Sequence, residues 1–209
     1  MDDQFATTDS EQTDRWRRTA LEYLREQLRE DAPAALGAMT LFKRSPLEGE
    51  GQTVVFEFTA ARGGPDVSRY AVVVGDTEPN YYPAEDLTAE ELFELHLGTR
   101  FMLVLGVSMV PHAEIQADDQ YDMHRDARQI VARVAPDAVL SDLEPAATFR
   151  VGDELHAVLR CRLNGRPVYV MGRDAPLGFS TRTHLHPHVA YRLHLGHVLR
   201  REMNSDSSR

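Results

Sequence analysis

The stretch ELHAVLRCRLNGRPVYVMG, Glu154 to Gly172, decides the fold because it joins two apolar runs through Asn164-Gly165. Asn-Gly favours a type I′ turn, in which both central residues take a positive φ, and such a turn connects two antiparallel strands. In the first run, apolar residues alternate with polar ones, which is typical of a strand with one buried face. We therefore predict a β-hairpin with strands at Glu154–Leu163 and Arg166–Gly172.

The first half of the chain contains a similar pair of predicted strands. One is TVVFEFT, Thr53–Thr59, whose apolar residues alternate, and the other is the apolar run RYAVVVG, Arg69–Gly75. The segment between them contains Gly63-Gly64-Pro65, which favours a turn. A short strand at Met39–Arg44 is predicted to precede this hairpin.

Helices are predicted on either side of the first pair of strands. One helix runs from about Asp14, which suits an N-cap, to about Leu36. Another follows Thr88, because Thr88 and Glu91 have the spacing of a capping box. The first of these helices has an apolar stripe that recurs every four residues, formed by Trp16, Ala20, Leu24 and Leu28.

Helices are also predicted around the second pair of strands. The first has acidic residues at its start, Asp118, Asp119 and Asp122, as expected from the helix dipole. The last begins at about Pro187, since proline suits the first turn of a helix. The apolar stripe of the first comprises Met123, Ala127, Ile130, Val131 and Val134.

The two halves share landmarks in the same order. RYAVVVGDTEP (Arg69–Pro79) aligns with RPVYVMGRDAP (Arg166–Pro176), and LHLG occurs at Leu95–Gly98 and again at Leu193–Gly196. We infer an internal duplication with a period of about 100 residues, which is too long for a solenoid repeat. The predicted fold is therefore α+β, with two related α-β-β-β-α halves whose antiparallel sheets pack against helices.

The two halves are placed at residues 13–112 and 113–203. Residues 1–12 are acidic and polar and residues 204–209 are polar, so both are predicted to be disordered tails. No linker rich in Pro, Gly or Ser separates the halves, and we expect them to dock closely. The predicted order of elements resembles that of bacterial secretion chaperones, a resemblance that implies a small, acidic and non-catalytic protein.

The chain of 209 residues has a net charge of −10, which disfavours binding to nucleic acid or anionic membranes. A cluster of Arg15, Arg17 and Arg18 is expected to form a solvated helix face. The longest apolar run, Phe101–Val110, is about half of a bilayer span. The N-terminus lacks the basic start and apolar stretch of a signal peptide. We therefore expect a cytoplasmic protein that binds neither nucleic acid nor membrane.

Sequence motifs for catalysis are weak. Cys161 is the only cysteine, so no internal disulfide forms, and its place in the alternating strand predicts a buried thiol rather than a nucleophile. The chain has no Walker loop, no G-x-G-x-x-G and no G-x-S-x-G context. We therefore expect no cofactor, and we favour a protein that is not an enzyme.

The segment THLHPHVAYRLHLGH, near the C-terminus, is rich in histidine. His184, His186 and His188 alternate and His197 follows, and on a strand the first three would share a face as metal ligands often do. The alternative is therefore a metal-binding protein or metal-dependent hydrolase, with zinc the preferred ion. A helix start at Pro187 would break this alternation, so we favour structural or surface histidines. The histidine within LHLG is expected to have a packing role in both halves.

An aromatic segment follows the second strand of each predicted pair. Asn80-Tyr81-Tyr82-Pro83 and its counterpart Leu177-Gly178-Phe179 are predicted loops. Aromatic residues on a loop bind a partner or ligand, or they pin the loop onto the core. Tyr81, Tyr82 and Phe179 are therefore the candidate binding residues of a non-enzymatic interaction, adaptor or chaperone-like protein. Its partner would be another protein or a second copy, and a small-ligand pocket between the halves would fit the same residues.

Overall fold

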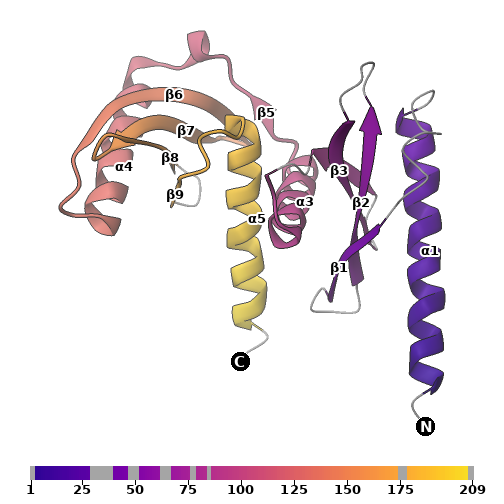
Figure 1. Cartoon of the computed structure of the whole chain (residues 1–209). Coiled ribbons are helices and arrows are strands. Elements are labelled where there is room, and N and C mark those ends of the chain that lie inside the picture. Colours follow the sequence, from indigo (N-terminus) through magenta and orange to yellow (C-terminus); the bar gives the residue numbers. More distant parts are fainter. Residues whose placement is uncertain are drawn as a thin grey trace. The chain divides into compact units, whose positions relative to one another are not determined.

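The computed structural model describes residues 3–28, 40–46, 52–61, 67–75, 79–83, 86–173 and 178–206. Over these residues the protein is α+β, with two antiparallel sheets (Figure 1). The chain divides into two compact units, one of residues 1–96 with 203–209 and the other of residues 97–202. Among the described helices, none has the length and apolar character needed to cross a membrane.

The first unit is built on a four-stranded antiparallel sheet whose strands neighbour one another in chain order. Its elements are α1 (Asp3–Leu28), β1 (Thr40–Pro46), β2 (Gln52–Ala61), β3 (Val67–Gly75) and β4 (Asn80–Pro83). Helix α1 covers one face of the sheet because its apolar stripe meets the alternating side chains of β2 and β3. This core comprises Ala20, Leu24, Val54, Phe56, Phe58, Tyr70, Val72 and Val74.

Helix α3 (Ala89–Val104) begins at the predicted capping box. The backbone N–H of Thr88 donates to Glu91 Oε2 at 2.8 Å, and the N–H of Glu91 donates to Thr88 Oγ1 at 3.3 Å. Two amides at the helix start are thereby satisfied reciprocally, which confirms the prediction. Residues from Leu97 onward belong to the second unit.

The second unit contains a five-stranded antiparallel sheet, again in chain order. The predicted hairpin is confirmed: β7 and β8 are joined by Asn164 and Gly165, whose φ angles are 50° and 78°. Both values lie in the left-handed region that a type I′ turn requires. The elements are β5 (Ser108–Met109), a 3-10 turn (His112–Glu114), α4 (Ala117–Val134), β6 (Leu140–Val151), β7 (Glu154–Leu163), β8 (Arg166–Arg173), β9 (Gly178–Ser180) and α5 (Pro187–Asp206), of which residues up to Glu202 belong to this unit.

Each face of this sheet carries its own core, formed with α4 on one face and with α5 on the other. Figure 1 labels the two helices. Helix α4 packs on one face through Met123, Ala127, Ile130 and Val131, which confirms most of the predicted stripe. Val134 is 53% exposed because the helix ends there. The face toward α5 is lined by Phe149, Val158, Tyr169, Met171, Ala190, Tyr191 and Leu195.

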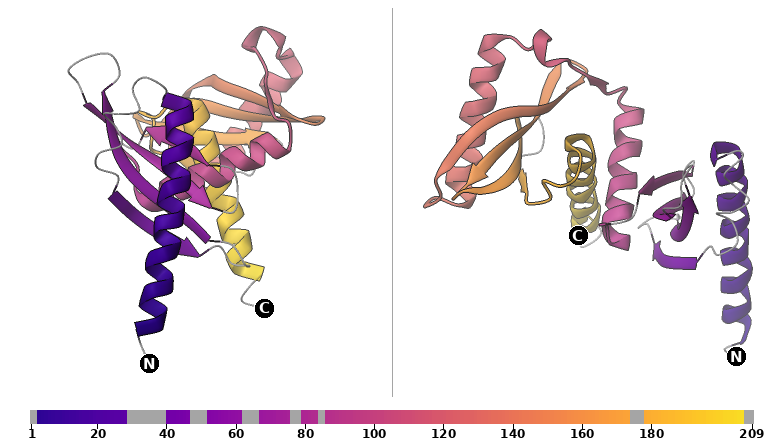
Figure 2. Two further views of the ribbon diagram at one scale, coloured as in Figure 1. Left: turned by 90° about the vertical axis from the view of Figure 1, so that its right-hand side faces the viewer. Right: turned by 45° about the horizontal axis from the view of Figure 1, so that its top comes forward.

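Within the second unit, the last turns of α3 approach α5 at a glycine, and both views of Figure 2 show the two helices adjacent. A Cβ atom added to Gly98 would lie 1.9 Å from the carbonyl oxygen of Arg192 and 3.1 Å from the backbone nitrogen of Gly196. The LHLG glycines therefore meet at a close helix crossing, where a larger residue has no room.

Four observations differ from the predictions. Helix α1 starts at Asp3, within the segment predicted to be disordered; that segment has no glycine or proline, and acidic residues suit a helix start. Helix α5 likewise extends to Asp206, into the second predicted tail. The two predicted aromatic loops are short strands, β4 and β9, paired with β3 and β8. The predicted end of the first helix at about Leu36 and the turn at Gly63-Gly64-Pro65 lie outside the described residues.

Strand β6 was not located from the sequence, although a first strand was expected in each half. Its sequence contains Pro145 and two acidic residues, Asp142 and Glu144, which disfavour a strand, and Pro145 lies beside an irregularity in the pairing with β7. The predicted alignment of Arg69–Pro79 with Arg166–Pro176 equates residues that pack in different cores. It equates Val72, which faces α1, with Tyr169, which faces α5.

Candidate functional site

Phe179 is the predicted binding residue with a large exposed side chain. It lies on β9 opposite Val170 of β8, so its ring is on the face of the sheet that α4 covers. It is nevertheless 43% exposed, because α4 packs elsewhere on that face. The phenyl ring is therefore an apolar surface at the edge of the sheet.

The position of β9 depends on its glycine. A Cβ atom at Gly178 would lie 2.2 Å from Cε1 of His194, so the His194 ring of α5 rests directly against this strand. Gly178 pairs with Met171, which faces α5, whereas Phe179 points to the opposite face. The LHLG histidine thus packs against β9 from one side while Phe179 is presented on the other.

Phe179 lines a cavity of about 740 Å³, called here the Phe179 pocket. This volume lies within the range of ordinary ligand pockets. The pocket is bounded by the end of β7, the Asn-Gly turn, the start of β8 and the segment after β9. Its described lining comprises Leu163, Asn164, Arg166, Pro167, Val168, Phe179, Thr181 and Thr183.

Hydrogen bonds fix the walls of the Phe179 pocket. The side chain of Asn164 accepts from the backbone N–H of Val139, and the N–H of Asn164 donates to the Val139 carbonyl, both at 2.9 Å. The Tyr169 hydroxyl donates to the carbonyl of Leu185 at 3.1 Å, which holds the segment between β9 and α5. The pocket is therefore preorganised, which lowers the entropic cost of binding.

The charge of the Phe179 pocket is opposite in sign to that of the whole chain. Arg166 is the only charged side chain among its described lining residues, in a protein whose net charge is −10. Arg166 is exposed, and no described acidic side chain pairs with it. The neighbouring Arg162 pairs with Asp142 at 3.4 Å. An apolar group with a nearby carboxylate fits this lining.

Tyr81 and Tyr82, the other predicted binding residues, contribute to packing within the first unit. Tyr82 is 6% exposed, and its hydroxyl lies 3.2 Å from Nδ1 of His96. Tyr81 packs against the α1 core, with its ring centroid 6.4 Å from that of Tyr23. Of the three predicted residues, Phe179 has the largest exposed apolar surface.

The histidine-rich segment does not form a strand. His184 lies in a turn, Pro187 begins α5 as predicted, and His184, His186 and His197 are exposed. The rings of His186 and His188 are neighbours at 4.9 Å. Among the described residues, no three His, Cys, Asp or Glu side chains are placed to hold a metal ion.

A buried polar network in the second unit was missed by the sequence analysis. His156, on the α5 side of β7, bonds through Nδ1 to the hydroxyl of Tyr191, and its Nε2 lies 3.4 Å from Glu154 Oε2. Burial, and then the charge of Glu154, raises the pKa of Tyr191, so its hydroxyl stays protonated and donates to Nδ1. The imidazole Nε2–H then donates to the carboxylate. The one available signal was a histidine within an apolar strand.

Cys161 is 1% exposed, as predicted for a core thiol. Burial raises the pKa of its thiol to about 11, so the nucleophilic thiolate is scarce at neutral pH.

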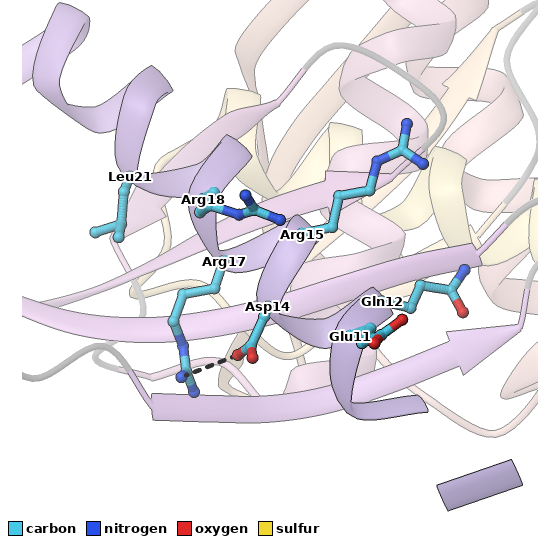
Figure 3. A pocket seen from close by; sticks show the side chains of 7 residues that line it. All are labelled: Glu11, Gln12, Asp14, Arg15, Arg17, Arg18 and Leu21. Atoms are coloured by element: carbon cyan, nitrogen blue, oxygen red, sulfur yellow. Dashed lines mark ion pairs between the residues drawn. The ribbon is translucent and has the colours of Figure 1, made fainter. Parts of the chain in front are cut away.

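A second cavity, of about 940 Å³, lies beside α1 (Figure 3). Its described lining residues all come from that one helix, between Glu11 and Leu21, and they do not converge on a common point. Arg17 pairs with Asp14 at 3.7 Å, and its guanidinium lies 5.9 Å from the centroid of the Phe56 ring. Arg15 and Arg18 are exposed, as expected for a solvated helix face.

In comparisons with known proteins, no family model, no curated protein and no solved structure matches this chain.

Proposed function

We propose that this protein is a non-enzymatic interaction protein that binds a segment of a protein chain in the Phe179 pocket. The observation that carries this proposal is the half-exposed ring of Phe179 on an edge strand, in a cavity with fixed walls. Large apolar rings in preformed pockets dominate the energy of many protein interfaces. The described lining offers apolar groups for an apolar side chain of the bound segment. It also offers amide, hydroxyl and guanidinium groups for the polar groups of that segment.

We propose further that the two units arose by duplication. In both, residues of four adjacent strands form a cross-strand row, and an irregularity follows the first residue of that row. This arrangement supports a common origin, because bulges are specific features rather than defects. The rows are Leu41, Phe56, Val72 and Tyr81 in the first unit, and Pro145, Leu159, Val170 and Phe179 in the second.

A peptide-display selection tests the binding role of the Phe179 pocket. A random peptide library is selected on the wild-type chain, and the recovered peptides are then measured against Phe179→Asp. A carboxylate in the pocket is expected to weaken binding by about 30-fold or more, the effect of losing an interface hot spot. Val104→Asp is the matched control, since Val104 is 78% exposed and lies outside the pocket lining. Peptides that bind both variants as well as the wild type would refute the proposal.

A further inference from the structure

The first unit shows what covers the aromatic residue at the end of the cross-strand row. Tyr81 is covered by Tyr23 of α1, whose hydroxyl donates to Asn80 Oδ1 at 3.2 Å. Phe179 has the same place in its own row, yet no described aromatic ring stacks on it. The site on the second unit is therefore suited to a tyrosine side chain.

The N-terminal part of α4 offers such a side chain. Tyr121 is 67% exposed and lies on the solvent-facing side of the helix. Asp118 lies three residues before it in the sequence. Residues three apart on a helix lie on the same side, so the phenol and this carboxylate form one surface. Asp118 is exposed, and no described basic side chain pairs with it. The aromatic ring of Tyr121 is thus complementary to the ring of Phe179. The negative charge of Asp118 is complementary to the positive charge of Arg166.

Tyr121 is too distant to reach the pocket of its own chain. Asn164 of the pocket bonds to Val139, just beyond the C-terminal end of α4, whereas Tyr121 lies in the second turn of that helix. At about 1.5 Å per residue, Tyr121 and Val134 are about 20 Å apart along the axis. Tyr121 can therefore enter the Phe179 pocket only of a second copy of the chain.

We propose that two copies of this chain associate through α4, with Tyr121 of one copy in the Phe179 pocket of the other. Asp118 of the inserted helix pairs with Arg166 at the pocket. Two such contacts related by a two-fold axis close a dimer, because each copy supplies one helix and one pocket. This inference rests on the proposed role of the Phe179 pocket in binding protein, and it names the partner.

Sedimentation velocity over a range of concentrations tests this contact. About 0.15 M salt is used, because it screens repulsion between two copies of net charge −10 beyond about 8 Å. The wild type is expected to approach twice the mass of one chain as its concentration rises. Tyr121→Ala is expected to raise the dissociation constant by about 30-fold or more, as for a hot-spot aromatic. Asp118→Asn is expected to raise it by up to about 5-fold, as for an exposed ion pair.

A mixture of two variants gives the sharpest control. Tyr121→Ala and Phe179→Ala are each expected to remain monomeric alone. In a homodimer of the first variant both contacts lack the tyrosine, and in a homodimer of the second both contacts lack the phenylalanine. Mixed together, they are expected to form a heterodimer, since the second variant still supplies Tyr121 and the first still supplies an intact pocket. Val104→Asp is expected to leave the wild-type mass distribution unchanged.

The outcomes separate this inference from the proposed function. A wild-type chain that stays monomeric, or a dimer that ignores both variants, refutes the contact through Tyr121. If a monomeric chain still selects peptides that depend on Phe179, the interaction role is supported and only the identity of the partner is wrong. A dimer that is restored in the mixture supports both.

Discussion

Gly98→Ala is expected to destabilise the second unit, although alanine is the better helix former. An added Cβ would lie 1.9 Å from the carbonyl oxygen of Arg192, whereas ordinary contact begins near 3.4 Å. Helix α5 would have to withdraw by about 1.5 Å, the difference between these distances. The obstructing atom belongs to the backbone of α5, so no side-chain rotation relieves the clash.

The expected change in the free energy of unfolding caused by Gly98→Ala follows from two opposing effects. Alanine gains about 1 kcal/mol over glycine in a helix interior. Overpacking costs about 1–3 kcal/mol and sometimes more. A gap of about 1 Å already removes up to half of each dispersion contact along the separated helices. Because a backbone atom is involved, we expect the upper part of this range and a net loss of about 2 kcal/mol in the free energy of unfolding.

Urea denaturation followed by circular dichroism measures this loss. Trp16 is the only tryptophan and lies in the first unit, so its fluorescence reports that unit separately. Gly172→Ala is the matched control, because its Cβ would meet Ile130 Cδ1 at an ordinary 3.4 Å. We expect that variant to change stability by about 0.5 kcal/mol or less. If Gly98→Ala is as stable as the wild type or more stable, α3 and α5 do not meet at this glycine.

Three further predictions concern the degree to which individual side chains are buried. Tyr82→Ala is expected to cost about 3 kcal/mol or more and Phe179→Ala about 1 kcal/mol or less, because only Tyr82 is buried; equal losses in thermal denaturation would contradict this difference. Cys161, with a pKa raised to about 11 by burial, is expected to resist a disulfide reagent at pH 8 until urea unfolds the chain; rapid labelling of the native protein would be inconsistent with the buried site. Burial lowers the pKa of His188, so its neutral form contributes stability above about pH 6.5, and this is lost as pH falls through the lower folded pKa. Accordingly, His188→Gln is expected to flatten the acid branch of the stability profile, and an unchanged slope would exclude this role.

Local signals in the sequence predicted several elements closely. Asn164-Gly165 required a tight hairpin because both residues tolerate positive φ, and the structure has that turn. Thr88 and Glu91 marked the start of α3 through their reciprocal hydrogen bonds. Pro187 marked the start of α5 and thereby argued correctly against a strand of histidines. Each of these signals acts within a few residues, so the chain alone specifies it.

Elements stabilised by distant neighbours were harder to predict. β4 and β9 are four and three residues long and depend on pairing with β3 and β8, so they looked like loops. β6 contains a proline and acidic residues, and its partner β7 supplies the pairing that its own sequence does not indicate. The predicted alignment of β3 with β8 rests on similar residue types, which do not indicate the face of the strand that meets a helix, and it equates residues of different cores.

The sequence by itself determined the α+β class, the central hairpin, the helix starts and the burial of Cys161, because turn geometry, capping and hydrophobic alternation are short-range effects. Only the tertiary structure decided which aromatic residues are exposed and which histidines pack. Tyr82 and Phe179 both lie on short strands at the end of a sheet, yet the first bonds to His96 within a core and the second lies open beside Arg166. That difference depends on the helix over each face, because His96 of α3 contacts Tyr82 whereas α4 leaves Phe179 exposed. Exposure is thus a property of the packed neighbours rather than of the residue itself.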